Sequence, residues 1–334
     1  MTTIYTFSGS TNSTMDANSA DTTYIIAEGA SITPPSGFAI NATSDAANRS
    51  FVINGRLGGN VGLELGNDYT QPSDIHITVG ATGLIKSVYE GIVSKGDGAV
   101  ITNNGEIDSY WGIEARGNHL SIDNTGAIKA TTYGLDIMSA DADVKNSGNI
   151  DAGTGIGVSI NSYMGGSSTF VNTGTVSGGA YGILTYYGDD TVINKGIVDG
   201  KIDLYMGNDA YDGNGGIVHG VIDGNYGNDR LKGGSHCDHL SGGTEHDVLT
   251  GRGGADHFIF STDFDHDTIT DFDVSGTGDD RVDLTGMKGF DSFGDLKGHM
   301  YQDGADAVLD FGHGDVLTLD NVDFHDLSKA DFLF

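Results

Sequence analysis

The chain has 334 residues, of which 16 are Lys or Arg and 47 are Asp or Glu, so its formal net charge is -31. A surface this acidic is not expected to bind nucleic acid, one cysteine cannot form an intramolecular disulfide, and no apolar run is long enough to predict a membrane-spanning helix. The acids are 41 Asp against 6 Glu, which indicates short carboxylates at fixed turn positions.

Residues 1–200 repeat one unit of about 22 residues, which reads apolar-x-Asn-x-Gly-x-Ile. Dense glycine and asparagine, short β-branched stretches and no 3.6-residue apolar period predict strands rather than helices. We therefore expect an all-β fold, a right-handed parallel β-helix whose stacked coils bury a continuous core. The first glycine of the clear copies is Gly105, Gly126, Gly148, Gly174 and Gly196, and a second glycine follows at Gly112, Gly134, Gly155 and Gly182.

An asparagine stands two residues before each of the first glycines. If coils stack at the strand spacing of about 4.8 Å, these side chains form an internal amide ladder at one turn, which is a structural role. The expected ladder residues are Asn103, Asn124, Asn146, Asn172 and Asn194.

One face of this array is a candidate carbohydrate site, because parallel β-helices often carry polysaccharide lyases, epimerases and glycosidases. Glu114 and Asp136 occupy one position of consecutive coils, with Arg116 nearby, and stacked acids about 5 Å apart match a retaining glycosidase pair. The alternative is aromatic packing along a solenoid face with incidental acids. Aromatic residues that could stack on sugar rings are Trp111, Tyr133 and Tyr181. A second cluster, which we expect to be exposed, contains Tyr186, Tyr187, Asp189 and Asp190.

Between residues 201 and 260 the unit becomes shorter, and an aspartate stands two residues before an apolar or aromatic residue each time. Four nine-residue units of the pattern Gly-Gly-x-Gly-x-Asp-x-apolar-x follow one another without a gap. They are GNYGNDRLK, GGSHCDHLS, GGTEHDVLT and GRGGADHFI, which begin at Gly224, Gly233, Gly242 and Gly251. Four units in register predict a parallel β-roll.

Each nine-residue unit is expected to form half a coil, so units two apart stack on the same edge. Asp229 is then expected beside Asp247 and Asp209, and Asp238 beside Asp256. Stacked carboxylates repel unless a cation lies between them, and aspartates with glycine-turn carbonyls supply the oxygen ligands of a hard cation. We therefore expect several Ca²⁺ ions. The residues expected to form these sites are Gly207, Asn208, Asp209, Gly224, Gly227, Asn228, Asp229, Gly233, Gly234, Asp238, Gly242, Gly243, Asp247, Gly251, Gly253, Gly254 and Asp256.

Two units depart from the pattern at the fourth position, which should be glycine because the turn needs a positive φ. His236 and Glu245 stand there. Each must take a left-handed conformation at a cost of about 1–2 kcal/mol, or the turn is remodelled. Imidazole and thiolate groups also suit zinc, but a strand-turn repeat lacks the usual context of a zinc site, so zinc is not expected. The residues of this cluster are His236, Cys237, His239 and His246.

The nonapeptide block resembles the calcium-binding repeats of RTX (hemolysin-type) proteins. The segment GADHFIFSTDFDHDTITDFDVSGTGDDRVDLTGM is similar to the one after the calcium roll of serralysin-type secreted proteins, and the final GDVLTLDNVDFHDLSKADFLF resembles their export region. By this resemblance, residues 261–334 form a cap with a secretion signal that a type I secretion apparatus reads. The resemblance also implies that Asp267 and Asp271 close the last calcium sites.

The resemblance implies an extracellular location. The first residues lack the basic start and apolar core of a Sec-type signal peptide, and export through a type I apparatus explains how such a chain is secreted. The serralysin protease motif His-Glu-x-x-His does not occur, nor does the Gly-x-Ser-x-Gly of a lipase. Two function classes remain. The first, which we favour, is a non-catalytic surface, matrix or adhesion protein that contacts polysaccharide and folds on binding calcium. The alternative is a polysaccharide-acting enzyme that uses the β-helix face.

Overall fold

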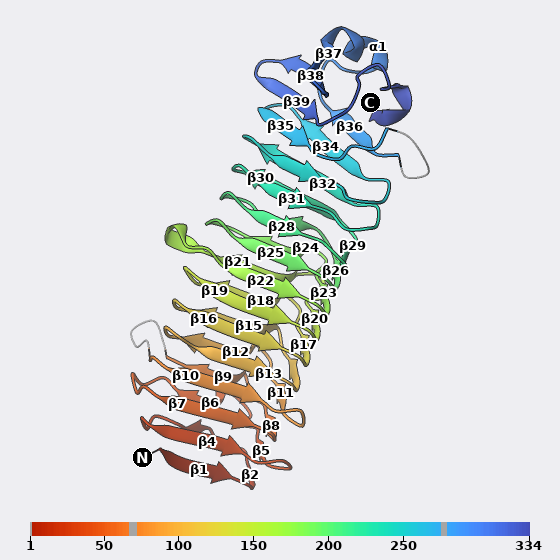
Figure 1. Ribbon diagram of the computed structural model, residues 1–334. Coiled ribbons are helices and arrows are strands. Elements are labelled where there is room, and N and C mark those ends of the chain that lie inside the picture. The colour runs from red at the N-terminus through yellow and green to blue at the C-terminus, as the bar shows by residue number, and fades with distance from the viewer. Residues whose placement is uncertain (1, 67–71, 275–278) are drawn as a thin grey trace.

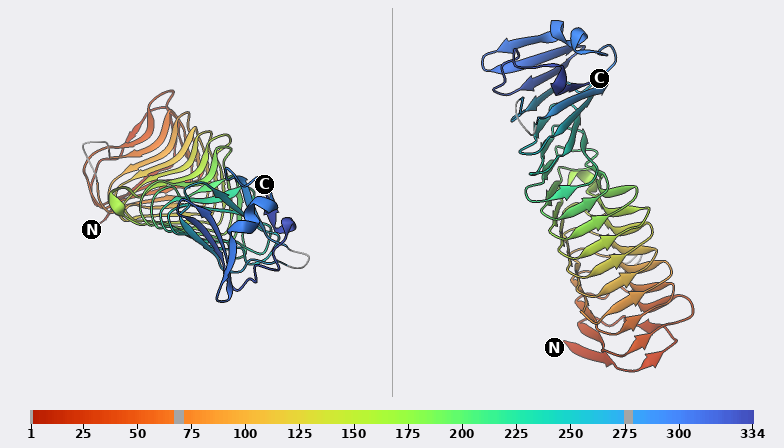
Figure 2. Two further views of the ribbon diagram at one scale, coloured as in Figure 1. Left: turned by 90° about the horizontal axis from the view of Figure 1, so that it is seen from above. Right: turned by 90° about the vertical axis from the view of Figure 1, so that its right-hand side faces the viewer.

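The computed structural model describes residues 2–66, 72–274 and 279–334, which wind into a parallel β-solenoid (Figure 1). The coils stack along one axis, and the two ends of the chain lie at opposite ends of the stack (Figure 2). The expected all-β parallel solenoid is therefore confirmed.

Sheet A runs from the first coil to the C-terminal cap, and its strands pair in parallel up to the cap. Its strands along the solenoid are β1 (Thr3–Phe7), β4 (Thr22–Ile26), β7 (Arg49–Ile53), β10 (Ile75–Val79), β13 (Val100–Asn103), β16 (Leu120–Asn124), β19 (Ala142–Asn146), β22 (Thr169–Asn172), β25 (Thr191–Asn194), β28 (Ala210–Asp212), β31 (Arg230–Lys232), β33 (Val248–Thr250) and β35 (His266–Ile269).

Sheet B forms a second side of the coil in the N-terminal part only. Its strands are β2 (Ser10–Thr11), β5 (Ser31–Ile32), β8 (Arg56–Leu57), β11 (Leu84–Lys86), β14 (Glu106–Asp108), β17 (Ala127–Lys129), β20 (Asn149–Asp151), β23 (Thr175–Ser177), β26 (Ile197–Asp199) and β29 (Ile217–Val218).

Sheet C forms the remaining side along the whole solenoid. Its strands are β3 (Met15–Asp16), β6 (Phe38–Ala42), β9 (Val61–Leu65), β12 (Glu90–Lys95), β15 (Trp111–Arg116), β18 (Tyr133–Met138), β21 (Ile156–Asn161), β24 (Tyr181–Thr185), β27 (Ile202–Asp203), β30 (Val221–Tyr226), β32 (His239–Thr244), β34 (His257–Ser261), β36 (Arg281–Gly286) and β40 (Phe332–Leu333).

The cross-section of the coil changes where sheet B ends at β29. Beyond it only sheets A and C continue, and two nine-residue units complete one coil. Arg230 pairs with Val248 in sheet A, and His239 pairs with His257 in sheet C, so partners lie 18 residues apart. The expectation that each unit forms half a coil is thus confirmed.

The C-terminal cap begins where β39 (Asp315–Leu319) pairs with β35. The strands β38 (Asp306–Gly312) and β37 (Met300–Asp303) then add to sheet A in antiparallel fashion. Short helical turns complete the cap: α1 (Phe293–Leu296), η2 (Lys297–His299) and η3 (Lys329–Asp331). Residues 275–278 of the segment with serralysin-type resemblance lie outside the described residues.

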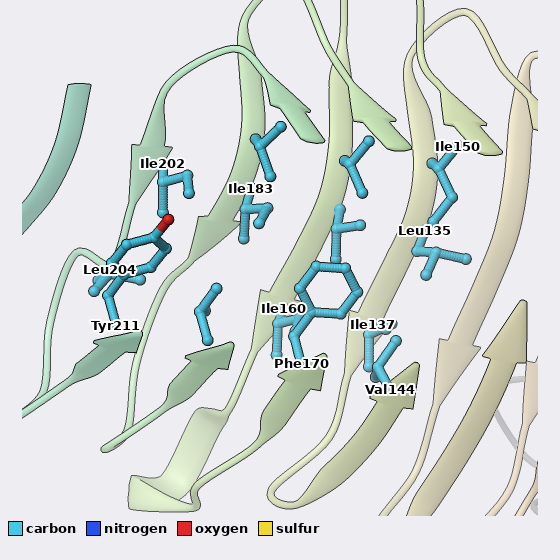
Figure 3. Close-up of a cluster of buried hydrophobic side chains, with 14 of the residues drawn as sticks. Leu135, Ile137, Val144, Ile150, Ile160, Phe170, Ile183, Ile202, Leu204 and Tyr211 are labelled. Atoms are coloured by element: carbon cyan, nitrogen blue, oxygen red, sulfur yellow. The ribbon is translucent and has the colours of Figure 1, made fainter. Parts of the chain in front are cut away.

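The core consists of stacked columns of apolar side chains from the three sheets, which meet on the solenoid axis (Figure 3). Alternation along a strand sends every second side chain inward, and a β-branched or aromatic residue of one coil lies on its equivalent in the next. The column of sheet B contains Leu57, Ile85, Ile107, Ile128, Ile150, Val176 and Val198.

The expected asparagine ladder is present, and it lies at the carboxyl ends of sheet A strands. Each side-chain Nδ2 donates to the Oδ1 of the next asparagine at 2.7–2.9 Å, and all five residues are buried. The order is Asn103, Asn124, Asn146, Asn172 and Asn194.

Replacing the middle member, as Asn146→Ala, is expected to destabilise the protein by about 1–3 kcal/mol, because it breaks two buried hydrogen bonds of the ladder. Asn124 Nδ2 then retains only a 3.4 Å bond to the Gly126 carbonyl, and Asn172 Oδ1 retains only the Gly174 backbone N–H. The matched control is Asn149→Ala, since Asn149 is exposed a few residues further along the same coil. Urea unfolding followed by circular dichroism measures both. Equal midpoints for the two variants would show that the ladder adds nothing.

Candidate functional site: two files of buried aspartates

A file of aspartates follows one edge of sheet A from the last coils of the β-helix through the roll. In every member after the first, the side-chain Oδ1 accepts a hydrogen bond of 2.7–2.8 Å from the backbone N–H of the aspartate one coil before it. All are at most 2% exposed. This sheet A file consists of Asp190, Asp209, Asp229, Asp247 and Asp267.

A second file follows the equivalent edge of sheet C. The backbone N–H of Asp238 donates to Asp256 Oδ1 at 2.8 Å, and that of Asp256 donates to Asp280 Oδ1 at 2.9 Å. The expected stacking of Asp229 with Asp247 and of Asp238 with Asp256 on opposite edges is therefore confirmed.

Sequence reasoning missed two members of these files, Asp190 and Asp280. Asp190 was expected to be exposed, yet it is 2% exposed, and its Oδ1 accepts from Ser162 Oγ and from the Ser168 backbone N–H. The signal was present, because Gly-Asp-Asp-Thr-Val around Asp190 has the same Asp-x-apolar order as Gly-Asn-Asp-Ala-Tyr around Asp209. Asp280 also stands two residues before an apolar residue. Asp190 and Asp280 were missed because neither falls at the nine-residue spacing of the repeat.

The turn before each aspartate of the sheet A file has a residue with positive φ two positions earlier. These residues are Gly188, Gly207, Gly227, Glu245 and Asp265. Glu245 therefore takes the left-handed conformation (φ 83) that its position in the unit predicted. His236 does not. There the turn is remodelled, and the Gly234 backbone N–H donates to Asp238 Oδ2 at 2.6 Å.

The first glycine of each nine-residue unit lies against the carboxylate of its own unit. A Cβ atom built on Gly224 would lie 2.2 Å from Asp229 Oδ2, and one built on Gly242 would lie 2.2 Å from Asp247 Oδ2. Gly233 and Gly251 make the same approach to Asp238 and Asp256. Any larger residue at these positions must displace the carboxylate.

The substitution Gly242→Ala is therefore expected to destabilise the roll by about 1–3 kcal/mol, the usual cost of overpacking. The matched control is Gly253→Ala in the next unit, because a Cβ on Gly253 would meet no atom within 4 Å. Thermal unfolding in millimolar Ca²⁺ compares the two variants. A Gly253→Ala loss as large as that of Gly242→Ala would contradict this steric role.

The second oxygen of each carboxylate in the sheet A file is unpaired. The Oδ2 atoms of all five aspartates are buried without a hydrogen-bond partner in the described part of the chain. Burial accordingly raises the pKa of Asp190, Asp229 and Asp247 to about 7 and that of Asp209 and Asp267 to about 9. In the second file, burial raises the pKa of Asp256 to about 7.

These unpaired oxygens fit the donor set of a hard cation. Nowhere in residues 2–66, 72–274 and 279–334 do three His, Cys, Asp or Glu side chains gather at one point. Each site would thus combine one or two carboxylates with main-chain carbonyl oxygens, and all-oxygen ligands suit Ca²⁺. The side chains that would supply Oδ2 ligands are those of Asp209, Asp229, Asp247 and Asp267.

The remaining residues expected at the calcium sites divide by position. Asn208 and Asn228 are exposed and form a ladder of their own, in which the Asn228 backbone N–H donates to Asn208 Oδ1 at 2.9 Å. Both carboxylate oxygens of Asp271 accept from backbone N–H groups, those of Gly251 and Arg252. Asp271 is thus already hydrogen-bonded at the turn. Gly207, Gly227, Gly243 and Gly254 all have positive φ angles, which explains why glycine occupies these four positions.

The four residues of the imidazole and thiol cluster lie on different edges of the roll. His239 stacks on His257 of sheet C at a ring distance of 4.8 Å, whereas His246 contacts His266 beside sheet A at 5.2 Å. Cys237 is a free, exposed thiol.

The acid pair on sheet C lies in one column, since Glu114 pairs in register with Asp136. Both are buried, at 6% and 8% exposed. Glu114 Oε1 lies 2.7 Å from Arg116 Nε, and Ser159 Oγ donates to Asp136 Oδ1 at 3.3 Å. Burial, followed by the charge of Glu114, raises the pKa of Asp136. The pair is therefore covered and already bonded, with little surface left for a substrate.

The three aromatic residues share one column of sheet C, but it is interrupted. Trp111 and Tyr133 are half-buried neighbours with an edge-to-face contact at 5.3 Å. Ile156 separates Tyr133 from Tyr181. The glycine that stacks on Gly134 is Gly157. The predicted second glycine of this coil, Gly155, is therefore wrong by two residues.

Neither the protein-family models nor the curated proteins compared with this chain match it. In the described residues, no helix is long and apolar enough to cross a membrane.

Proposed function

We propose that this chain is a secreted, RTX-type calcium-binding solenoid whose C-terminal third folds on calcium, and that it serves as a non-catalytic cell-surface or matrix protein that contacts polysaccharide. The observation that carries the proposal is the file of five buried aspartates whose Oδ2 atoms have no partner. A buried ionised carboxylate with an unpaired oxygen is costly, and a cation between coils removes that cost.

Calcium would act through linkage between binding and folding. The ion binds the stacked coils but not the extended chain, so its binding free energy becomes folding free energy. Extracellular modules bind Ca²⁺ with dissociation constants of about 0.1–1 mM. A cytosol with little free calcium then leaves the acidic roll unfolded, and the extracellular medium folds it.

The position of the C-terminal tail supports export before folding. Phe332 is buried and pairs with Val282 through strand β40, and Asp331 caps the turn η3 by accepting from the Ser328 backbone N–H. A tail folded into sheet C in this way is not free for a secretion channel. We therefore infer that a type I secretion apparatus reads the tail in the unfolded chain.

Circular dichroism and thermal unfolding of the full chain test the proposal. In excess chelator we expect a weaker strand signal from the roll and cap and a lower unfolding midpoint, and millimolar Ca²⁺ should restore both. Millimolar Mg²⁺ is the control, because it demands octahedral geometry and retains its waters. Identical spectra and midpoints in chelator and in calcium would refute calcium-coupled folding.

A further inference from the structure

A cleft opens at the corner where sheet C turns into sheet A, next to the junction of the three-sheet and two-sheet coils. The turn η1 (Tyr163–Gly165) projects from the side of the solenoid (Figure 1). Two of its residues, Tyr163 and Gly165, line the cleft. The cavity has a volume of about 470 Å³. Its lining residues are Tyr163, Gly165, Tyr187, Gly188, Asp189, Met206 and Gly207.

The floor of the cleft is backbone. A Cβ on Gly188 would lie 2.0 Å from the carbonyl oxygen of Gly166, and a Cβ on Gly207 would lie 2.0 Å from that of Gly188. Gly188 and Gly207 also have positive φ angles of 93° and 143°. Neither position accepts a side chain without displacing the backbone of the preceding coil, so both must be glycine.

The walls are exposed and apolar. Tyr187 is 45% exposed, Tyr163 37% and Met206 38%. Exposed aromatic side chains next to a preformed hollow are a common feature of ligand sites.

The tyrosine rings beside the cleft are held in place. Tyr205 has a φ of 63°, which is rare for a bulky residue and is typical of functional sites. Its ring makes edge-to-face contacts with three other tyrosine rings, at centroid distances of 6.0–6.4 Å. The three are Tyr186, Tyr187 and Tyr226. The ring of Tyr187 thus has an aromatic neighbour in the free protein, and any restriction of the ring before binding lowers the entropy cost of binding.

A polar rim follows the same corner. The Asn208 backbone N–H donates to Asp189 Oδ1 at 2.8 Å, and Asn228 Nδ2 donates to Asn208 Oδ1 at 3.1 Å. All three side chains are exposed. The rim thus offers a carboxylate acceptor and amide groups that both donate and accept.

We infer that this cleft binds an uncharged hexose unit of a polysaccharide. A sugar ring presents an apolar face of C–H groups and an edge of hydroxyls, and the tyrosine wall and the amide rim match these two surfaces. The net charge of -31 and Asp189 in the lining disfavour uronic or sulfated sugars. The inference rests on the proposed function and moves its polysaccharide contact from the Trp111 column to this junction.

The test uses the calcium-loaded full chain with cellohexaose and mannohexaose as neutral probes and an oligogalacturonate as the anionic probe. Saturation-transfer NMR and calorimetry should detect at least one neutral probe. Tyr187→Ala should weaken that binding about tenfold, the loss expected for one stacking ring with its buried area, whereas Tyr187→Phe should retain it. The matched control is Tyr110→Ala, since Tyr110 is equally exposed, at 47%, and lies outside the cleft.

Three results would overturn the inference: no binding of either neutral probe, tighter binding of the anionic probe, or equal losses in Tyr110→Ala and Tyr187→Ala. Thermal unfolding of the same samples with and without chelator separates this inference from the proposed function. A calcium-dependent midpoint without sugar binding rejects only the cleft, and a calcium-independent midpoint rejects the calcium proposal itself.

Discussion

Asp229→Asn is expected to be more stable than the unmodified chain in chelator at pH 8 and less stable than it in millimolar calcium. Burial raises the pKa of Asp229 from 3.8 to about 7, which corresponds to on the order of 4 kcal/mol between its protonated and ionised forms. Asparagine removes that charge and keeps the Oδ1 acceptor for the Asp209 backbone N–H. After the cost of burying its amide, a gain of about 1–3 kcal/mol remains.

Calcium reverses the sign of this effect. A neutral amide is a weaker ligand than a carboxylate, so the variant loses part of the binding free energy, about 1–3 kcal/mol for one site at millimolar calcium. Thermal unfolding in chelator and in calcium measures both arms. Asp199→Asn is the control with the same charge change, because the side chain of Asp199 is 66% exposed on sheet B. A variant that is destabilised equally in both media would indicate a purely structural role for Asp229.

The fold was predictable because its information is periodic. One asparagine and one glycine per coil fix the turn, and the apolar residues at alternate positions of each strand fix the inward face, so the stack follows from spacing alone. The asparagine ladder and the opposite edges of Asp229 and Asp238 therefore agree with the structure. The limit of this reasoning appears at Gly155 and Gly157. Both satisfy the motif, and only the pairing of Leu135 with Val158 decides between them.

The state of the side chains was less predictable than their positions. Glu114 and Asp136 do stack as expected, but their burial depends on their neighbours: Arg116 from the next column bonds Glu114, and Ser159, the next member of the same column, bonds Asp136. Asp190 shows the same difficulty in reverse. Its coil has the long spacing of the β-helix, yet its turn already has the geometry of the roll, with Gly188 at positive φ. The aspartate file therefore begins before the nine-residue repeat does.

This overlap has a physical consequence for the junction. Asp190 donates its backbone N–H to Asp209 Oδ1 and accepts from Ser162 and Ser168 of the preceding coil. The polar ladder thus continues without a break from serines to aspartates across the change of cross-section. Folding of the roll on calcium would then extend an ordered edge that the β-helix already supplies.

Without calcium, the protein is expected to lose stability as the pH rises from about 4 to 9. The folded-state pKa is raised to about 7 for Asp229 and Asp247 and to about 9 for Asp209 and Asp267, against a reference of 3.8. The folded chain then binds more protons than the unfolded chain throughout this window, so the free energy of unfolding falls with increasing pH. The protonated carboxyls contribute their full stabilisation to the folded state below about pH 4. This stabilisation is lost as the pH rises through their folded-state pKa values.

Calcium should oppose this trend, because the ion needs ionised carboxylates and competes with their protons. The stabilisation by millimolar calcium is therefore expected to be larger at pH 8 than at pH 5, and calcium binding near pH 7 should release protons. Unfolding midpoints at pH 5, 7 and 9 in chelator and in calcium, together with calorimetry in buffers of different ionisation enthalpy, measure both effects. A chelated midpoint that rises between pH 5 and 8 would contradict the burial of unpaired aspartate oxygens, and calcium binding without proton release would place the ion away from the aspartate file.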